Sequence, residues 1–163
     1  MIRSAGLFTI AVNSSWQMAR FADVIYAGDP AWWDHNQAII DIPAERWSCY
    51  QGAALAFGVN CHPMPNGPFN SGQRAIQFAI ERGANRVILL GYDCSVANGS
   101  HWHGDHKETK NPNAKRAQIW QGQFAAIELG DCQVINCSRE TELKAFPRMK
   151  LEDALCSYMP CVA

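Results

Sequence analysis

The stretch 68–94 of this 163-residue sequence constrains the fold most, because it contains consistent signals for a helix, a turn and a strand. Asn70 is a favourable N-cap, and Gln73 follows three residues later, as in a capping box. The residues expected to face inwards are Ala75, Ile76, Ala79 and Ile80, and those expected to face solvent are Arg74, Gln77, Glu81 and Arg82. Gly83 ends the helix, and the apolar run within 86–93 is typical of a strand covered on both faces. A helix, a tight turn and a buried strand make up half of a βαβ unit.

Similar signals recur along the rest of the chain. Strands are predicted at 7–12, 23–27 and 132–136, and weaker ones at 46–50 and 58–62. Helices are predicted at 16–20, after Pro30, at 114–130 and at 150–156. This alternation predicts a Rossmann-like three-layer α/β sandwich with a mainly parallel sheet, formed by a single domain, 1–163, with a lid loop at about 95–113. The apolar strand 7–12 is expected in a central position, with a homodimer as a further possibility.

The composition is that of an ordinary globular protein, with 48% hydrophobic and 18% charged residues. A net charge of −1 gives no reason to expect nucleic acid or an anionic membrane as a partner. The seven cysteines are odd in number and include no Cys-x-x-Cys pair, so they indicate neither a disulfide framework nor a four-cysteine zinc site. No apolar run approaches the length of a membrane-spanning helix. We therefore expect a soluble protein of the cytoplasm that needs no cofactor.

Polar residues follow several of the predicted strands, at the ends where ligands bind in open α/β sheets. The candidate binding residues at these ends are Asn13, Asp29, Tyr92, Asp93, Asn136 and Ser138, and those at the start of the 70–83 helix are Asn70, Ser71 and Gly72. Because parallel strands end at one edge of a sheet, these residues are predicted to share a cleft.

Two adjacent tryptophans, Trp32 and Trp33, follow the strand end at Asp29. They have two interpretations. Both indoles belong to the core, or they form a wall on which a ring-bearing ligand stacks.

The segment 101–106, His-Trp-His-Gly-Asp-His, carries three imidazoles and a carboxylate within six residues. His101, His103 and His106, with Asp105, could bind a transition metal, although their spacing matches no established metal motif. A histidine of this segment could instead be a general base or could protonate a leaving phosphate. The third interpretation is that they are loop residues hydrogen-bonded to neighbours or water.

The order of these motifs resembles an uncharacterised family of phage and prophage proteins over nearly the whole chain. The matching motifs are Asn-Ser-Gly at 70–72, Leu-Gly-Tyr-Asp at 90–93, the histidine segment, Phe-Pro at 146–147 and Leu-Glu-Asp-Ala-Leu at 151–155. More remotely, the chain is similar to the family 42 bacterial sialyltransferases and to archaeal pterin diphosphokinase-like proteins. The resemblance to the sialyltransferases implies a CMP-sugar along the strand ends and a lid histidine as general base, without a metal.

Transferred to this sequence, the resemblance implies that Asn13, Asp29, Ser71, Gly72 and Ser138 contact the nucleotide and that His103 or His106 is the base. Asp93 is a further candidate catalytic residue at a strand end. Both related families begin with a strand followed by a Gly-Asn-Gly-Pro-Ser motif, and this sequence starts after that point. The chain is therefore expected to be longer in nature or to have lost the phosphate-binding turn. The second case implies a non-catalytic nucleotide- or partner-binding protein, and a metal-dependent hydrolase built on the histidine segment is a further alternative.

Overall fold

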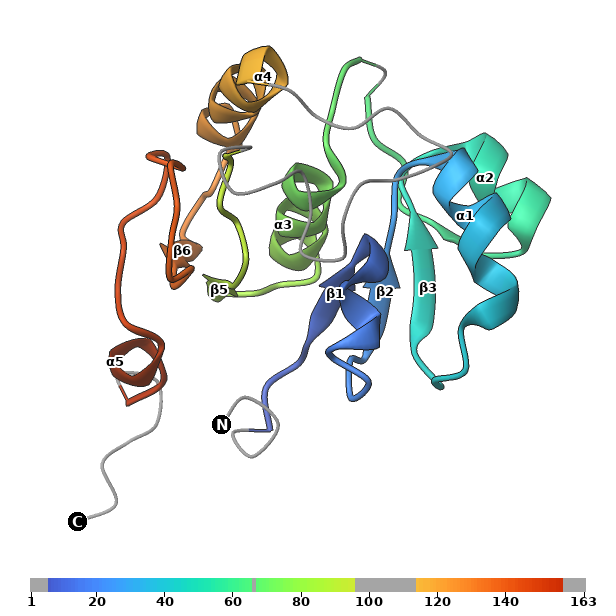
Figure 1. Ribbon diagram of the computed structural model, residues 1–163, viewed down its shortest axis with the longest axis horizontal. Coiled ribbons are helices and arrows are strands. Elements are labelled where there is room, and N and C mark those ends of the chain that lie inside the picture. The colour runs from blue at the N-terminus through green and yellow to red at the C-terminus, as the bar shows by residue number, and fades with distance from the viewer. Residues whose placement is uncertain (1–5, 66, 96–113, 157–163) are drawn as a thin grey trace. The chain divides into compact units, whose positions relative to one another are not determined.

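The computed structural model describes residues 6–65, 67–95 and 114–156, drawn as ribbons in Figure 1. The chain divides into two compact units, Met1–Phe78 and Ala79–Ala163, and the division falls inside helix α3 (Ser71–Glu81). Both units combine helices with parallel strands, which confirms the predicted α/β class with a mainly parallel sheet.

The first unit contains a four-stranded parallel sheet with the strand order β1-β2-β3-β4. The strands are β1 (Ile10–Val12), β2 (Val24–Tyr26), β3 (Glu45–Ser48) and β4 (Asn60–Cys61). The other elements of this unit are α1 (Pro30–Asn36), α2 (Gln51–Phe57), the start of α3, and two 3₁₀ turns, Asn13–Gln17 and Gln37–Ile39. The predicted helix at 16–20 is therefore replaced by a 3₁₀ turn that begins at Asn13.

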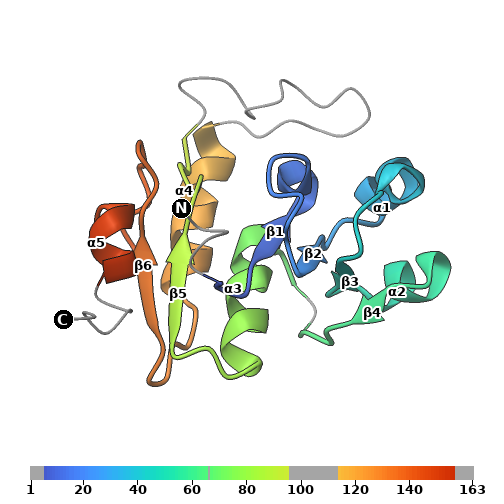
Figure 2. The ribbon, with the colours of Figure 1, turned by 90° about the horizontal axis from the view of Figure 1, so that it is seen from below.

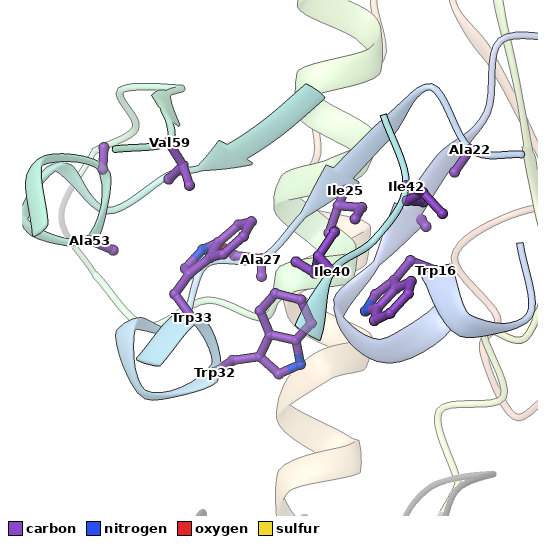
Figure 3. Packing of buried hydrophobic residues seen from close by; sticks show 12 residues of the cluster. Trp16, Ala22, Ile25, Ala27, Trp32, Trp33, Ile40, Ile42, Ala53 and Val59 are labelled. Carbon is purple, nitrogen blue, oxygen red and sulfur yellow. The ribbon is translucent and has the colours of Figure 1, made fainter. Parts of the chain in front are cut away.

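The side chains of β2 alternate between two apolar layers. Val24 and Tyr26 pack with Ala75 and Phe78 of α3, whereas Ile25 and the adjoining Ala27 face the other layer. That second layer contains Trp16, Trp32, Trp33 and Ala53, and Figure 3 shows the indoles grouped with Ile25 and Ala27. Helices thus cover both faces of the sheet, as expected for parallel strands buried on both sides.

Two sequence-based expectations for this unit are wrong. The strand predicted at 7–12 was expected in a central position, but β1 lies at an edge of the four-stranded sheet and pairs with β2. Its apolar residues reflect burial of its faces, which does not require a hydrogen-bonded neighbour on each side. Arg74 was assigned to the solvent side of α3, but only 7% of it is exposed.

The second unit contains the parallel pair β5 (Arg86–Leu89) and β6 (Gln133–Asn136). Helix α4 (Ala114–Ala125) and helix α5 (Leu151–Cys156) lie on opposite sides of this pair in Figure 1. Ala154 and Leu151 of α5 pack on Ile135 and Ile88, whereas Phe124 of α4 contacts the Tyr92 and Phe146 rings. The predicted strands and helices of this unit are all present, with somewhat shorter bounds.

Candidate functional site

The carboxyl ends of the four strands of the first unit meet at one edge of its sheet. Val12 is in register with Tyr26, and Tyr26 with Trp47, so the residues that follow these positions leave the sheet side by side. Figure 2 shows the same strands after a 90° turn. The edge is the place where open α/β sheets bind ligands, and it carries Asn13, Asp29 and the start of α3.

Asn13 follows β1 in a strained conformation. Its φ is +50°, and it shares a positive φ with only one other non-glycine residue of the described ranges, Cys94. The side-chain oxygen Oδ1 of Asn13 is buried and accepts no hydrogen bond from the described residues. The neighbouring Ser14, in contrast, has a hydrogen-bond partner, because its hydroxyl accepts a 3.2 Å hydrogen bond from Trp32 Nε1. A buried unsatisfied acceptor on a strained backbone is typical of a functional position.

A hydrogen bond from Gly28 links the loop after β2 to the start of α3. The Gly28 backbone N–H donates a 3.1 Å hydrogen bond to the Ser71 hydroxyl. A Cβ at Gly28 would lie 2.4 Å from Phe69 Cε2 and 2.9 Å from Cys49 Sγ. Only glycine therefore allows this approach, and the hydrogen bond holds Ser71 at the sheet edge.

Asp29 is exposed and caps α1, because its Oδ1 accepts a 2.9 Å hydrogen bond from the Ala31 N–H. Pro30 occupies the first position of that helix, as predicted. One carboxylate oxygen of Asp29 is thus engaged in capping. Asp29 and Asn13 thus lie at the same edge of the sheet, as predicted.

Asn70 caps α3, which confirms the prediction from the sequence. Its Oδ1 accepts a 2.7 Å hydrogen bond from the Gln73 N–H. The reciprocal half of a capping box is not formed, since the buried Oε1 of Gln73 has no hydrogen-bond partner among the described residues. Ser71 and Gly72 are the first two residues of α3 and are half-buried. The positive end of the helix dipole therefore lies at the sheet edge.

Trp32 and Trp33 belong to the core, so their assignment as a stacking wall is corrected. Trp33 is fully buried, Trp32 is 5% exposed, and the two rings pack edge to face at 5.0 Å. Their indole N–H groups donate to Ser14 Oγ and to the Ala27 carbonyl. Both rings are thus buried in the apolar cluster with Ile25 and Ala27, and neither is exposed for stacking on a ligand.

Three further polar residues at the edge were not predicted from the sequence: Tyr26, Cys49 and His62. The Tyr26 hydroxyl lies 2.7 Å from His62 Nδ1, and all three residues are buried. Burial raises the pKa of the Cys49 thiol, and a hydrogen bond from Tyr26 partly offsets this. Cys49 and His62 directly follow β3 and β4, so the rule that selected Asn13 would also have found them.

In the second unit, hydrogen bonds of Asn136 and Ser138 link the residues at the end of β6 to those that follow β5. The Ser138 hydroxyl accepts from the Tyr92 N–H at 2.8 Å, and Asn136 Oδ1 accepts from the Ser138 N–H at 3.0 Å. Asn136 Nδ2 donates to Thr141 Oγ1, whose hydroxyl donates to the Tyr92 carbonyl. The assignment of Asn136 as a binding residue is therefore corrected, because its amide is fully buried and both of its ends are hydrogen-bonded locally.

Tyr92 and Asp93 follow β5. Burial raises the pKa of the Tyr92 phenol above its ordinary value, and the nearby Cys94 adds to this effect. Asp93 is exposed, and its carbonyl accepts a 2.7 Å hydrogen bond from the Glu142 N–H. A neutral phenol and an exposed carboxylate are thus adjacent at this strand end.

His101, His103 and His106 lie outside the described residues. Within 6–65, 67–95 and 114–156, the histidine, cysteine and acidic side chains form no group of three that could hold a metal ion. In the same ranges, every helix is too short or too polar to cross a membrane.

Comparison with known proteins found no match. Neither a family model, nor a curated protein, nor a solved structure is similar to the chain. The evidence on function therefore comes from the residues themselves, and the resemblance to the phage family and to the sialyltransferases stays a prediction.

Proposed function

We propose that the sheet edge of the first unit binds a nucleotide-linked substrate such as a CMP-sugar, and that the chain is a transferase acting on it. The observation that carries the proposal is the buried, unpartnered Oδ1 of Asn13. An unsatisfied buried acceptor costs about 1–3 kcal/mol, and a positive φ adds strain. A ligand with N–H or O–H donors, as found on a base or a ribose, would satisfy this oxygen.

The start of α3 supports the phosphate part of the proposal. A helix N-terminus favours an anion, because the aligned peptide dipoles place a partial positive charge there. α3 runs for 11 residues, and the Gly28–Ser71 hydrogen bond keeps its first turn at the sheet edge. The Ser71 hydroxyl accepts from Gly28, so its own proton is directed elsewhere and is available to a phosphate oxygen.

The transfer step depends on the histidine segment. In this proposal His103 or His106 removes the proton from an acceptor hydroxyl, the hydroxyl oxygen bonds to the sugar, and the bond between the sugar and CMP breaks. CMP leaves with the electron pair of that bond.

The binding half of the proposal is tested with CMP, UMP, AMP and cytidine in calorimetric titrations. We expect at least one nucleotide to bind the wild-type protein and the Asn13→Gly variant to bind it up to about tenfold more weakly, the contribution of about one hydrogen bond. Glycine keeps the positive φ, so the fold is retained. The exposed Asn85→Ala variant is the matched control. If all four ligands fail to bind, the proposal is wrong.

The catalytic half is tested by CMP release from a CMP-sugar. We expect His103→Ala or His106→Ala to abolish release while CMP binding is kept. Binding without turnover in the wild-type protein would instead support the non-catalytic alternative. Metal analysis of protein purified without a histidine tag tests the hydrolase alternative, which requires close to one equivalent of bound metal.

A further inference from the structure

Arg74 is a buried cation. Only 7% of the residue is exposed. The polar pattern of α3, in whose first turns it lies, predicts a solvent-facing position instead. Charged residues are almost never buried to this extent unless they are paired. Its surroundings therefore need an explanation.

The guanidinium of Arg74 has no carboxylate partner among the described residues. Nη1 donates a 3.1 Å hydrogen bond to the side-chain oxygen of Gln77, and Nη2 donates a 3.1 Å hydrogen bond to the Pro65 carbonyl. Both acceptors are neutral. Nε is buried without any hydrogen-bond partner. An Arg side chain carries five N–H donors, and its Nε and Nη2 groups can bind one carboxylate or phosphate with two parallel hydrogen bonds. The structure thus leaves both the charge and the Nε donor uncompensated.

The guanidinium lies at the N-terminal end of the helix. Arg74 Cζ is 5.4 Å from the centroid of the Phe69 ring, and Phe69 directly precedes the N-cap residue Asn70. The same ring approaches Gly28, whose N–H is bonded to Ser71. The Phe69 ring that lies against the guanidinium is itself only half-buried.

We propose that Arg74 is the charge partner of a phosphate or pyrophosphate group that binds at the start of α3. The anion would accept from Arg74 Nε and Nη2, and the helix N-terminus would add its dipole. This inference rests on the proposed function and deepens it, since it assigns the phosphate of the substrate to a particular cation.

The test compares wild-type protein with Arg74→Met, which removes the charge and keeps an unbranched apolar chain. Arg82→Met is the matched control, because Arg82 is exposed beyond the other end of α3. Inorganic phosphate, pyrophosphate, CMP and cytidine are titrated by calorimetry and thermal unfolding. We expect CMP, and phosphate or pyrophosphate, to raise the melting temperature of the wild type and of Arg82→Met. The same ligands should bind Arg74→Met at least tenfold more weakly. Arg74→Lys keeps the charge without the planar fork and should be intermediate; it replaces Arg74→Met if that variant does not fold.

The outcomes separate this inference from the proposed function. If CMP and cytidine bind the wild type with equal affinity and Arg74→Met binds CMP as well as the wild type does, the role of Arg74 is refuted and nucleotide binding stands. If pyrophosphate binds in an Arg74-dependent manner while CMP binds no better than phosphate, the anion site stands and the nucleotide proposal fails. Absence of any anion-dependent stabilisation of the wild type overturns the anion site.

Discussion

The Tyr26 hydroxyl lies 2.7 Å from His62 Nδ1 in a buried layer beneath α3, and this hydrogen bond connects the end of β2 to the end of β4. The two rings also pack edge to face, and both contact Phe78. The pair fixes the spacing of two strands that are separated by β3 in the sheet.

Replacing Tyr26 by phenylalanine should lower the free energy of unfolding by about 1–3 kcal/mol. The ring contacts remain, whereas the buried imidazole loses its hydroxyl partner. Urea unfolding measures the change. Tyr50→Phe is the control, because Tyr50 is 52% exposed and its hydroxyl is accessible to water. Equal stability of Tyr26→Phe and wild type would show that the hydrogen bond contributes nothing.

Gly28→Ala should destabilise the first unit by about 1–3 kcal/mol, the usual cost of overpacking. The new Cβ would meet Phe69 Cε2 at 2.4 Å and Cys49 Sγ at 2.9 Å, so these two side chains would have to move from their packed positions. Gly122→Ala is the opposite case. A Cβ there meets nothing within 4 Å and the position is inside α4, so we expect a gain of about 0.5–1 kcal/mol. Thermal unfolding of both variants gives the comparison, and a stable Gly28→Ala protein would contradict the predicted clash.

At position 13, glycine should be more stable than alanine by about 1 kcal/mol, because the φ of +50° suits glycine and strains alanine. Asn13→Gly should also be at least as stable as the wild type, since it removes a buried acceptor without a partner. Denaturant unfolding of the three proteins tests both statements. A clear loss of stability in Asn13→Gly would mean that Oδ1 serves the fold and not a ligand.

Stability should fall with increasing pH in a way that depends on Cys94. Burial, with a contribution from Asp93, raises the pKa of the Cys94 thiol to about 12 from the ordinary value of 9.0. The folded protein thus holds this proton more tightly than the unfolded chain does. Its contribution is complete below about pH 9 and is lost as the pH rises towards 12.

The difference in unfolding free energy between wild type and Cys94→Ala isolates this effect from other titrating groups. We expect the difference to shrink from pH 9 upward and to be constant from pH 7 to 8.5. A difference independent of pH over the whole range would contradict the raised pKa.

Local signals in the sequence determined the secondary structure at α3, β5 and β6. A cap at Asn70, the apolar residues Val87–Leu89 and the β-branched pair Val134–Ile135 are signals from residues close in sequence, so each element could be predicted alone. The same applies to the α/β class, which follows from the alternation of these elements. Helix α2 was missed, because its sequence lacks a side-chain cap and its clearest boundary signal, Gly58 in the left-handed region, was assigned to a strand.

The tertiary structure decided which polar residues are structural and which are left unsatisfied. Asn13 and Asn136 look alike in the sequence, since each stands at the end of a predicted buried strand. Asn136 is hydrogen-bonded through both ends of its amide, whereas the oxygen of Asn13 is buried without a partner. The position of Arg74 in a helical pattern likewise predicts exposure, but the side chain is buried and contacts the Pro65 carbonyl and the Phe69 ring. Capping and periodicity act over a few residues, but burial and hydrogen-bond satisfaction depend on segments that are distant in the chain and therefore emerge only when it folds.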